Sequence, residues 1–204
     1  ISLLAGNLIS LANGVSIASL TGTIDIDAGA AFTMNDVSLL QTEGTIRVRA
    51  FGDITVGGIN AGTGVVSLTS TAGSILDGGD TYRDVIAAGL RLQALNAIGL
   101  LGASLNALYT QVSIISARAG VGGIAINEFD GLIVDSVTAV VDRVQVDGSS
   151  VSVVDNAQSE IVSSGGSSIV LNVGGSLSLN DGEADFASIN FRLGGLNNDV
   201  LFTA

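Results

Sequence analysis

The sequence predicts an all-β protein folded as a right-handed parallel β-helix, a solenoid of roughly nine coils. The first observation is a recurring phrase in which apolar and polar residues alternate, pause at a small residue, and alternate again. This phrase occupies residues 22–34, 44–56, 64–76 and 168–179. The second observation is its period of roughly 20 to 25 residues, which is typical of solenoid units that bury their apolar side only against their neighbours. Right-handedness is expected from the general chirality of parallel crossovers.

The spacing within the phrase predicts the strands of each coil. The first inward residues of successive coils are expected at Ile24, Ile46, Val66 and Leu90, with a later pair at Val144 and Ile169. A second strand begins eight or nine residues later, at Phe32, Ile54, Ile75, Ile98 and Leu177. A looser third strand is expected at residues 37–39, 85–86 and 161–162. Glycine is expected at the corners, because it adopts positive φ without a Cβ penalty.

Two alternatives compete with this fold. A β-sandwich also places strands about every 8 to 12 residues, but it has no reason to repeat a two-strand phrase. A helix is the alternative for residues 85–108, although residues 90–92 fit the strand phrase. Irregular coils are expected at residues 77–88 and 127–142, and a capping or partial coil at 185–204. No linker interrupts the chain, so residues 1–204 are expected to form a single β-solenoid domain, a fragment of a much longer chain.

Composition restricts the chemistry. The 204 residues include no Cys, His, Pro or Trp, and all 7 basic residues are Arg. Without Cys and His there are no disulfides, thiolate nucleophiles or usual zinc sites, and the commonest general base is missing. A net charge of −12 argues against binding to nucleic acid or to anionic membranes. No stretch approaches the roughly 18 uninterrupted apolar residues of a transmembrane helix, so we expect no membrane insertion.

One segment carries a family resemblance. Its matching residues are Ile98-Gly99, Ala107-Leu108, Thr110, Val112, Ser116-Ala117, Ala119, Gly122-Gly123-Ile124, Ile126, Glu128 and Asp130-Gly131-Leu132. Through them residues 96–137 resemble an element of very large bacterial secreted exoproteins of the filamentous haemagglutinin type. The resemblance implies a right-handed β-helix in a secreted or cell-surface adhesin. Such repeats often form the shaft, so the resemblance implies no particular ligand.

The stacking of the phrase predicts two outward ranks of polar residues on neighbouring coils. One rank reads Asp25, Arg47, Ser67, Arg91, and the other reads Asp27, Arg49, Thr69, Gln93. The simpler interpretation is a set of exposed, register-setting ion pairs. The functional interpretation is a shallow glycan-binding strip, or a uronate-binding lyase groove, formed by Asp25, Asp27, Arg47, Arg49 and Arg91.

No cofactor is expected except calcium, for which acidic turns offer oxygen ligands. The candidates are Asp77, Asp80, Asp181, Glu183 and Asp185. Their spacing matches no EF-hand, and Asp and Gly clusters are ordinary turn formers. Tyr82 and Tyr109 could stack on sugars, although a half-buried corner position is commoner for tyrosine.

These observations predict a structural or adhesive shaft segment of a secreted or cell-surface bacterial protein, without enzymatic activity. A host-cell or matrix glycan or protein is the expected kind of partner. The alternative is a polysaccharide lyase or glycosidase, which would need convergent carboxylates in a cleft built by long loops. An ice- or mineral-binding solenoid is disfavoured because the outward ranks mix Asp, Arg, Ser and Gln instead of repeating Thr.

Overall fold

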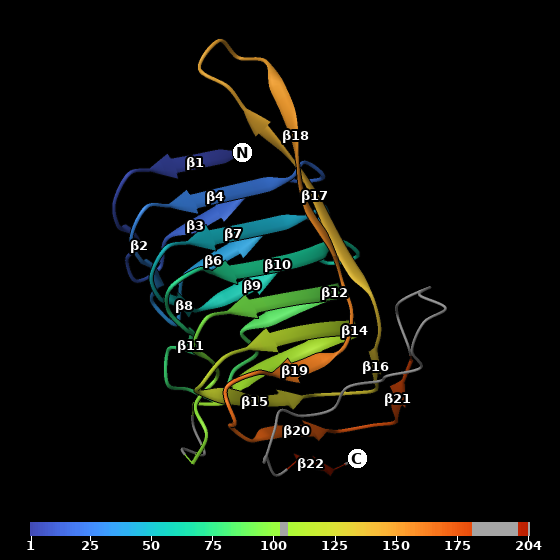
Figure 1. Cartoon of the computed structure of the whole chain (residues 1–204). Coiled ribbons are helices and arrows are strands. Elements are labelled where there is room, and N and C mark those ends of the chain that lie inside the picture. The colour runs from blue at the N-terminus through green and yellow to red at the C-terminus, as the bar shows by residue number, and fades with distance from the viewer. Residues whose placement is uncertain (103–105, 181–199, 204) are drawn as a thin grey trace.

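The computed structural model describes residues 1–102, 106–180 and 200–203. They form a parallel β-helix, and no helix occurs among them. Six coils stack along one axis, and each coil contributes one strand to the first sheet (Figure 1). The predicted fold class is therefore confirmed, and the β-sandwich and the helix at residues 85–108 are wrong.

The strands divide among three sheets that enclose the core. The first sheet is β1 (Ser2–Ala5), β4 (Ile24–Ala28), β7 (Ile46–Ala50), β10 (Val65–Ser70), β12 (Val85–Ala94) and β14 (Leu108–Ala119). The second is β2 (Ile9–Leu11), β5 (Phe32–Met34), β8 (Ile54–Val56), β11 (Ile75–Asp77), β13 (Ala97–Ile98), β15 (Gly123–Glu128), β20 (Ile169–Val173) and β22 (Val200–Thr203). The third begins with β3 (Ser16–Ala18), β6 (Leu39–Gln41) and β9 (Gly58–Asn60), and continues with the first halves of β12 and β14.

The last coils depart from this pattern. Strands β16 (Leu132–Val134) and β19 (Ile161–Ser163) both pair with β14, and β21 (Leu177–Leu179) pairs with β16. Strand β15 pairs with β13 through its first residues and with β14 through its last, so it spans the second and third sheets.

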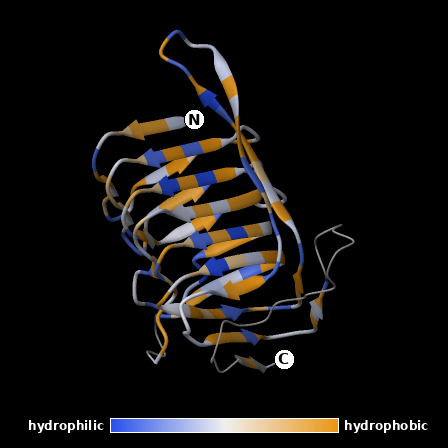
Figure 2. Cartoon of the chain, viewed as in Figure 1, coloured by the Kyte–Doolittle hydropathy of each residue, from blue (hydrophilic) through white to orange (hydrophobic). Residues whose placement is uncertain are grey.

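Inward apolar ranks fill the column, as the phrase predicts. Ile46 pairs directly with Ile24 and Val66, and Val66 pairs with Leu90. These four side chains are fully buried. Phe32, Ile54, Ile75 and Ile98 form the corresponding buried rank of the second sheet. The alternation of apolar and polar residues along these strands is visible in Figure 2.

Close approach between coils explains the glycine that opens the second and third phrases, Gly44 and Gly64. A Cβ on Gly64 would lie 2.1 Å from the carbonyl oxygen of Gly44, and a Cβ on Gly44 would lie 2.9 Å from that of Gly22. Neither Gly44 nor Gly64 has a positive φ. Glycine is therefore needed at this corner for space between coils, whereas Gly62, Gly99 and Gly123 have the expected positive φ.

The main correction concerns residues 137–158. They leave the β-helical column and form an antiparallel hairpin of β17 (Val137–Val144) and β18 (Ser150–Gln158). Val144 lies on this hairpin and is 42% exposed, so its predicted pairing with Ile169 is wrong; Ile169 pairs with Ile124. Because these residues add no coil and the step from Leu90 to Ile115 lengthens to 25 residues, the chain makes fewer coils than predicted.

The bounds of several other elements also differ from the predicted ones. Residues 127–142, expected to be irregular, include β16 and much of β17, and residues 85–88 already belong to β12. Val37 is 64% exposed and precedes its strand, which begins at Leu39. Ile161 joins the first sheet and not the third, because it pairs with Ala117. Most of the partial coil expected at 185–204 lies outside the described residues, whose last strand, β22, pairs with β20.

The hairpin runs across the outer face of the first sheet, almost along the column axis, and its tip extends past the N-terminal coil (Figure 1). Strand β17 contacts β1, β4, β7, β10, β12 and β14. The turn at the tip is closed by bonds from Gly148 N to Gln145 O and from Gln145 N to Ser149 O. Gly148 has a φ of 83°, which a side chain would disfavour. One hairpin thus bridges all six coils.

The inward ranks predict the effect of a buried charge. Ile46→Asp should lower the free energy of unfolding by several kcal/mol, because its carboxylate would lie in the column without a partner. Val37→Asp, at an exposed position, is the matched control and should cost little. Urea unfolding followed by circular dichroism measures both; equal, small losses would contradict the predicted packing of Ile46.

Candidate functional site

The two outward ranks meet as predicted. Asp25 pairs with Arg47 and Asp27 with Arg49 across β4 and β7. Arg47 Nη1 lies 3.0 Å from Asp25 Oδ1, and Arg49 Nη1 lies 3.2 Å from Asp27 Oδ1. The predicted register and ion pairs are therefore confirmed.

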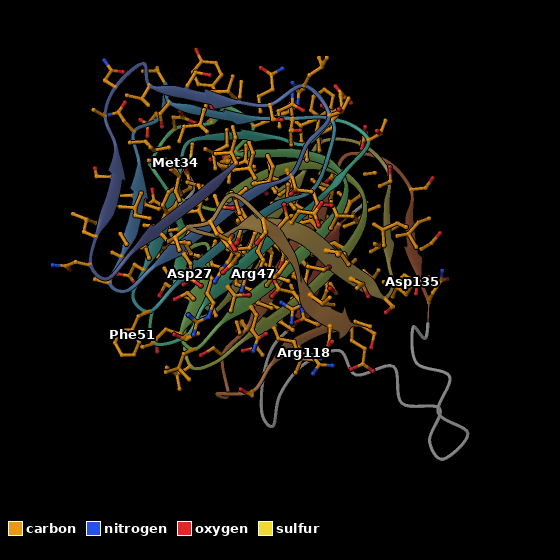
Figure 3. All side chains as sticks on the ribbon, turned by 90° about the horizontal axis from the view of Figure 1, so that it is seen from above. Asp27, Met34, Arg47, Phe51, Arg118 and Asp135 are labelled. Carbon is orange, nitrogen blue, oxygen red and sulfur yellow. The ribbon has the colours of Figure 1, made fainter. Side chains whose placement is uncertain are left out.

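The expectation that these pairs are exposed is wrong for the first rank. Asp25 is 0% and Arg47 5% exposed, because the hairpin lies over them. Figure 3, a view along the column, shows Asp27 and Arg47 on the side where the hairpin crosses the coils. In the second rank, the Arg49 side chain is 42% and the Asp27 side chain 21% exposed.

Arg143 and Asp155 on the hairpin complete the arrangement. Arg143 bridges Asp25 Oδ2 at 2.5 Å and Asp27 Oδ2 at 3.0 Å. Asp155 Oδ1 accepts a bond of 2.9 Å from Arg47 Nε. We call Asp25, Asp27, Arg47, Arg49, Arg143 and Asp155 the ion network. Its three carboxylates and three guanidinium groups balance, which limits the cost of burying them.

The pKa values of the network's cations reflect this balance. Burial by itself lowers the pKa of Arg47, but hydrogen bonds and charge attraction from Asp155 and Asp25 outweigh burial and raise it. The hydrogen bond to Asp25 is the main cause that raises the pKa of Arg143. Both guanidinium groups are therefore held charged under the hairpin.

Hydrogen bonds other than ion pairs extend the hairpin's attachment toward the C-terminal coils. Ser67 Oγ donates to Asp155 Oδ2 at 2.7 Å, and Arg91 Nε donates to the backbone oxygen of Asn156 at 3.1 Å. Burial lowers the pKa of Arg91, which has no salt bridge of its own among the described residues. Gln158 Nε2 donates to Leu92 O at 2.8 Å. The polar face of the first sheet is thus matched, coil by coil, by the hairpin.

This geometry bears on the predicted glycan-binding strip. The hairpin covers Asp25, Arg47 and Arg91, which are at most 8% exposed, so a glycan could reach them only if the hairpin lifted. Asp27 and Arg49 remain partly accessible. The strip stays a prediction, and its accessible part is limited to this second pair.

Sequence reasoning missed the hairpin residues that bind the ranks. Residues 137–144 alternate apolar and polar positions, and Asp147-Gly148 separates them from a second alternating run. Such a dipeptide between two alternating runs is a strong hairpin signal. The coil period instead predicts an irregular coil at residues 127–142 and a further coil that begins at Val144. A strand of a hairpin and a strand of a coil share the same two-residue period, so the period does not distinguish them.

The calcium candidates are only partly described. Asp181, Glu183 and Asp185 lie outside the described residues, and in the described part no three acidic side chains are placed to share one metal ion. Asp77 and Asp80 line a small cavity together with Asp36, Arg83 and Asp84. Calcium binding there stays a prediction.

Within that cavity, Asp77 and Asp84 form a buried carboxyl pair. Burial raises the pKa of Asp77, and burial also raises the pKa of Asp84 to about 9. Asp84 Oδ2 accepts the backbone N–H of Tyr109 at 2.7 Å. The hydrogen bond between the two carboxyl groups needs a proton, which Asp84 supplies. Asp77 Oδ2 is buried, and no N–H or hydroxyl group in the described part of the chain donates to it. This fits a carboxyl proton on Asp84 as the donor to Asp77.

The two tyrosines occupy different environments. Tyr82 is 80% exposed, whereas Tyr109 is half-buried on β14. Tyr109 lines a groove of about 540 Å³.

The Glu128 carboxylate beneath this groove accepts bonds from Thr110 Oγ1 at 2.7 Å and from the backbone N–H groups of Val112 and Asp130. Burial raises the pKa of Glu128 to about 7. Glu128 therefore holds a corner of the backbone together.

Comparison with known proteins finds no matching family model, no matching curated protein and no matching solved structure. The fold therefore rests on the structure, and the resemblance to filamentous haemagglutinin-type repeats rests on the residues of 96–137. The described residues contain no helix long and apolar enough to cross a membrane.

The ion network predicts unequal effects for two neighbouring arginines. Arg47→Ala should lower the free energy of unfolding by about 3 kcal/mol, because it leaves Asp155 and Asp25 buried with fewer partners. Arg49→Ala, the matched control, should cost less than about 1 kcal/mol, because Arg49 is partly exposed and Asp27 keeps Arg143. Chemical denaturation measures both. Equal losses would show that the hairpin does not bury the first rank in solution.

The carboxyl pair predicts a pH dependence. The folded state keeps a proton on Asp84 up to about pH 9, whereas the unfolded chain releases it near pH 4. Stability should therefore fall as the pH rises between these values and level off above about 9. The range from pH 7.5 to 9 isolates Asp84, because Glu128 has largely lost its proton there.

Asp84→Asn should flatten the fall between pH 7.5 and 9 and raise the melting temperature at pH 9. An asparagine can still accept from Tyr109 N and donate to Asp77 without a buried charge. Glu128→Gln is the control and should keep the slope in this range. An unchanged slope in Asp84→Asn would refute the shared proton.

Proposed function

We propose that this chain is a shaft segment of a secreted or cell-surface bacterial protein, in which the β-helix bears load and the hairpin ties its coils together. The observation that carries the proposal is the buried, charge-matched attachment of the hairpin along the whole column. A solenoid coil contacts only the coils next to it, so a bare solenoid can fray from its ends. Contacts that join distant coils oppose this fraying.

The contacts of the hairpin fit that role. Arg143 binds the second coil, Asp155 binds the third and fourth, and Gln158 reaches the fifth. Near the tip, Val144 N donates to Ser2 Oγ of the first coil at 2.8 Å. Peeling one coil from the end of the column would break contacts with a hairpin that other coils still hold.

Secretion and cell-surface placement are supported by the resemblance of residues 96–137 to filamentous haemagglutinin-type repeats. The acidic charge and the absence of cysteine are compatible with an extracellular rod but do not require one.

The enzymatic alternative has less support. In the described part of the chain, three buried or partly buried carboxylates already have structural partners. Asp25 and Asp155 bind arginines of the ion network, and Glu128 binds backbone N–H groups. A retaining or inverting glycosidase needs two carboxyl groups facing the scissile bond. We therefore expect no turnover of polysaccharides.

Removing the hairpin tests the shaft proposal. Val137 and Gln158 are paired neighbours, so a Gly-Ser link can replace residues 137–158. The pairs Asp25–Arg47 and Asp27–Arg49 would remain and keep the bare face polar. Hydrogen exchange followed by mass spectrometry should show faster exchange in β1 to β6 of the deletion variant, with little change in β15 and β20.

The double variant Arg143→Gln/Asp155→Asn keeps the hairpin but removes its two charges in the ion network, and it should show the same trend to a smaller extent. Uniform exchange in all three proteins would contradict the load-sharing role.

An experiment on cells tests the location. Antibodies against this chain should label intact cells of the producing bacterium or its culture medium. Confinement to the cytoplasm would overturn the surface assignment.

A further inference from the structure

The groove beside Tyr109 lies on a part of the column that the hairpin leaves open. It is lined by Thr81, Arg83, Tyr109, Thr110, Asn127, Glu128, Phe129, Asn172 and Gly174, and its volume is about 540 Å³. This volume falls within the range of small-ligand sites, roughly 300 to 1,000 Å³.

The floor of the groove is a ladder of planar side chains on rigid strands. Tyr109 on β14 pairs directly with Asn127 on β15, and Asn127 pairs directly with Asn172 on β20. Within the described part of the chain, the Asn127 side-chain amide forms no hydrogen bond, although the residue is half-buried. The Asn172 amide accepts from Thr203 Oγ1 and keeps its own donors for other partners.

The rim of the groove is aromatic and cationic. The Arg83 guanidinium carbon lies 3.8 Å from the centroid of the Phe129 ring. Arg83 forms no salt bridge with a carboxylate of the described residues, so the ring of Phe129 is its partner there. A guanidinium that lies flat on a ring keeps its N–H edge available for an oxygen-rich ligand.

We propose that this groove binds a saccharide chain, with one sugar unit lying over each successive strand of the ladder. Three features favour this class of ligand. Amide side chains can both donate to and accept from sugar hydroxyls, and an aromatic ring offers an apolar face for the C–H side of a pyranose. The spacing of neighbouring strands, roughly 4.8 Å, is close to the rise of one hexose unit in an extended polysaccharide.

Other ligands fit less well. Nucleic acid would meet a chain of net charge −12 with a single arginine at this rim. An added β-strand would need an open sheet edge, whereas the ladder belongs to strands that are already paired on both sides. Turnover is not expected, because both Glu128 oxygens are held by Thr110 and by backbone N–H groups.

This inference deepens the proposed function by giving the shaft a ligand. It rests on that function only for the location, outside the cell, at which the protein would encounter the saccharide. Isothermal titration of the whole chain with cellohexaose, chitohexaose and hexagalacturonate tests it. We expect at least one of them to bind with a dissociation constant below about 1 mM. Reducing ends and unsaturated uronate absorbance, followed in the same samples, should stay at background.

Variants then locate the site. Asn127→Ala and Asn172→Ala should each weaken binding at least tenfold, whereas Asn7→Ala, an exposed asparagine on the first coil, should leave it unchanged. Tyr109→Leu should weaken binding, and Tyr109→Phe, which keeps the ring, should restore it. Thermal unfolding of each variant confirms that it is folded.

Comparison of the charged and the neutral hexasaccharides also separates two sources of affinity. Tighter binding of hexagalacturonate that is lost in Arg83→Gln would assign a sugar carboxylate to Arg83; equal binding of the neutral chains would assign the affinity to the amides. No binding by any of the three, or binding that survives both asparagine changes, would overturn the proposal. Either result would leave the hydrogen-exchange test of the hairpin untouched.

Discussion

The parallel register between coils is the constraint on which the rest of the structure depends. Each coil buries its inward side chains only against the same positions of the next coil, as Ile46 does between Ile24 and Val66. A slip of one residue would exchange the inward and outward sets, so the apolar ranks hold the register firmly. The same register brings Asp25 beside Arg47 and Asn127 beside Asn172. Both polar features of the surface are therefore consequences of core packing.

The hairpin shows how a solenoid can use its outer face as a second interface. Buried ion pairs often add little net stability over an apolar contact of the same shape, because desolvation offsets their attraction. Their value here is in specificity: Arg143 must reach Asp25 and Asp27 while Asp155 reaches Arg47 and Ser67. We interpret this matching as the device that sets one position of the hairpin along the column, where apolar ranks alone would allow it to slide.

The division of the surface follows from these two interfaces. The hairpin removes the first polar rank of the first sheet from contact with large solutes, and its tip ties down the N-terminal coil. Toward the C-terminal end, β15 and β20 present their outward amides beside an aromatic rim. The carboxyl pair of Asp77 and Asp84 replaces apolar packing at one corner, which makes the stability of that corner sensitive to pH. The hairpin attachment, the carboxyl pair and the groove thus lie on different parts of one column.

The sequence by itself determined the solenoid, the strand pairs of residues 24–98 and the contacts of Asp25 with Arg47 and Asp27 with Arg49. These follow from a local period of two and a repeat of 20 to 24 residues, which fix both the facing of each side chain and its neighbour on the next coil. The tertiary structure decided which outward ranks are buried. Strand facing alternates in residues 137–158 as it does in a coil strand, and only their docking distinguishes a hairpin from another coil. Arg143 docks on Asp25, 118 residues away in sequence, and Asp155 on Ser67, 88 residues away. The groove likewise depends on Arg83, Tyr109, Phe129 and Asn172, which no local pattern connects. They meet because the stacked strands β12, β14, β15 and β20 bring them to one place.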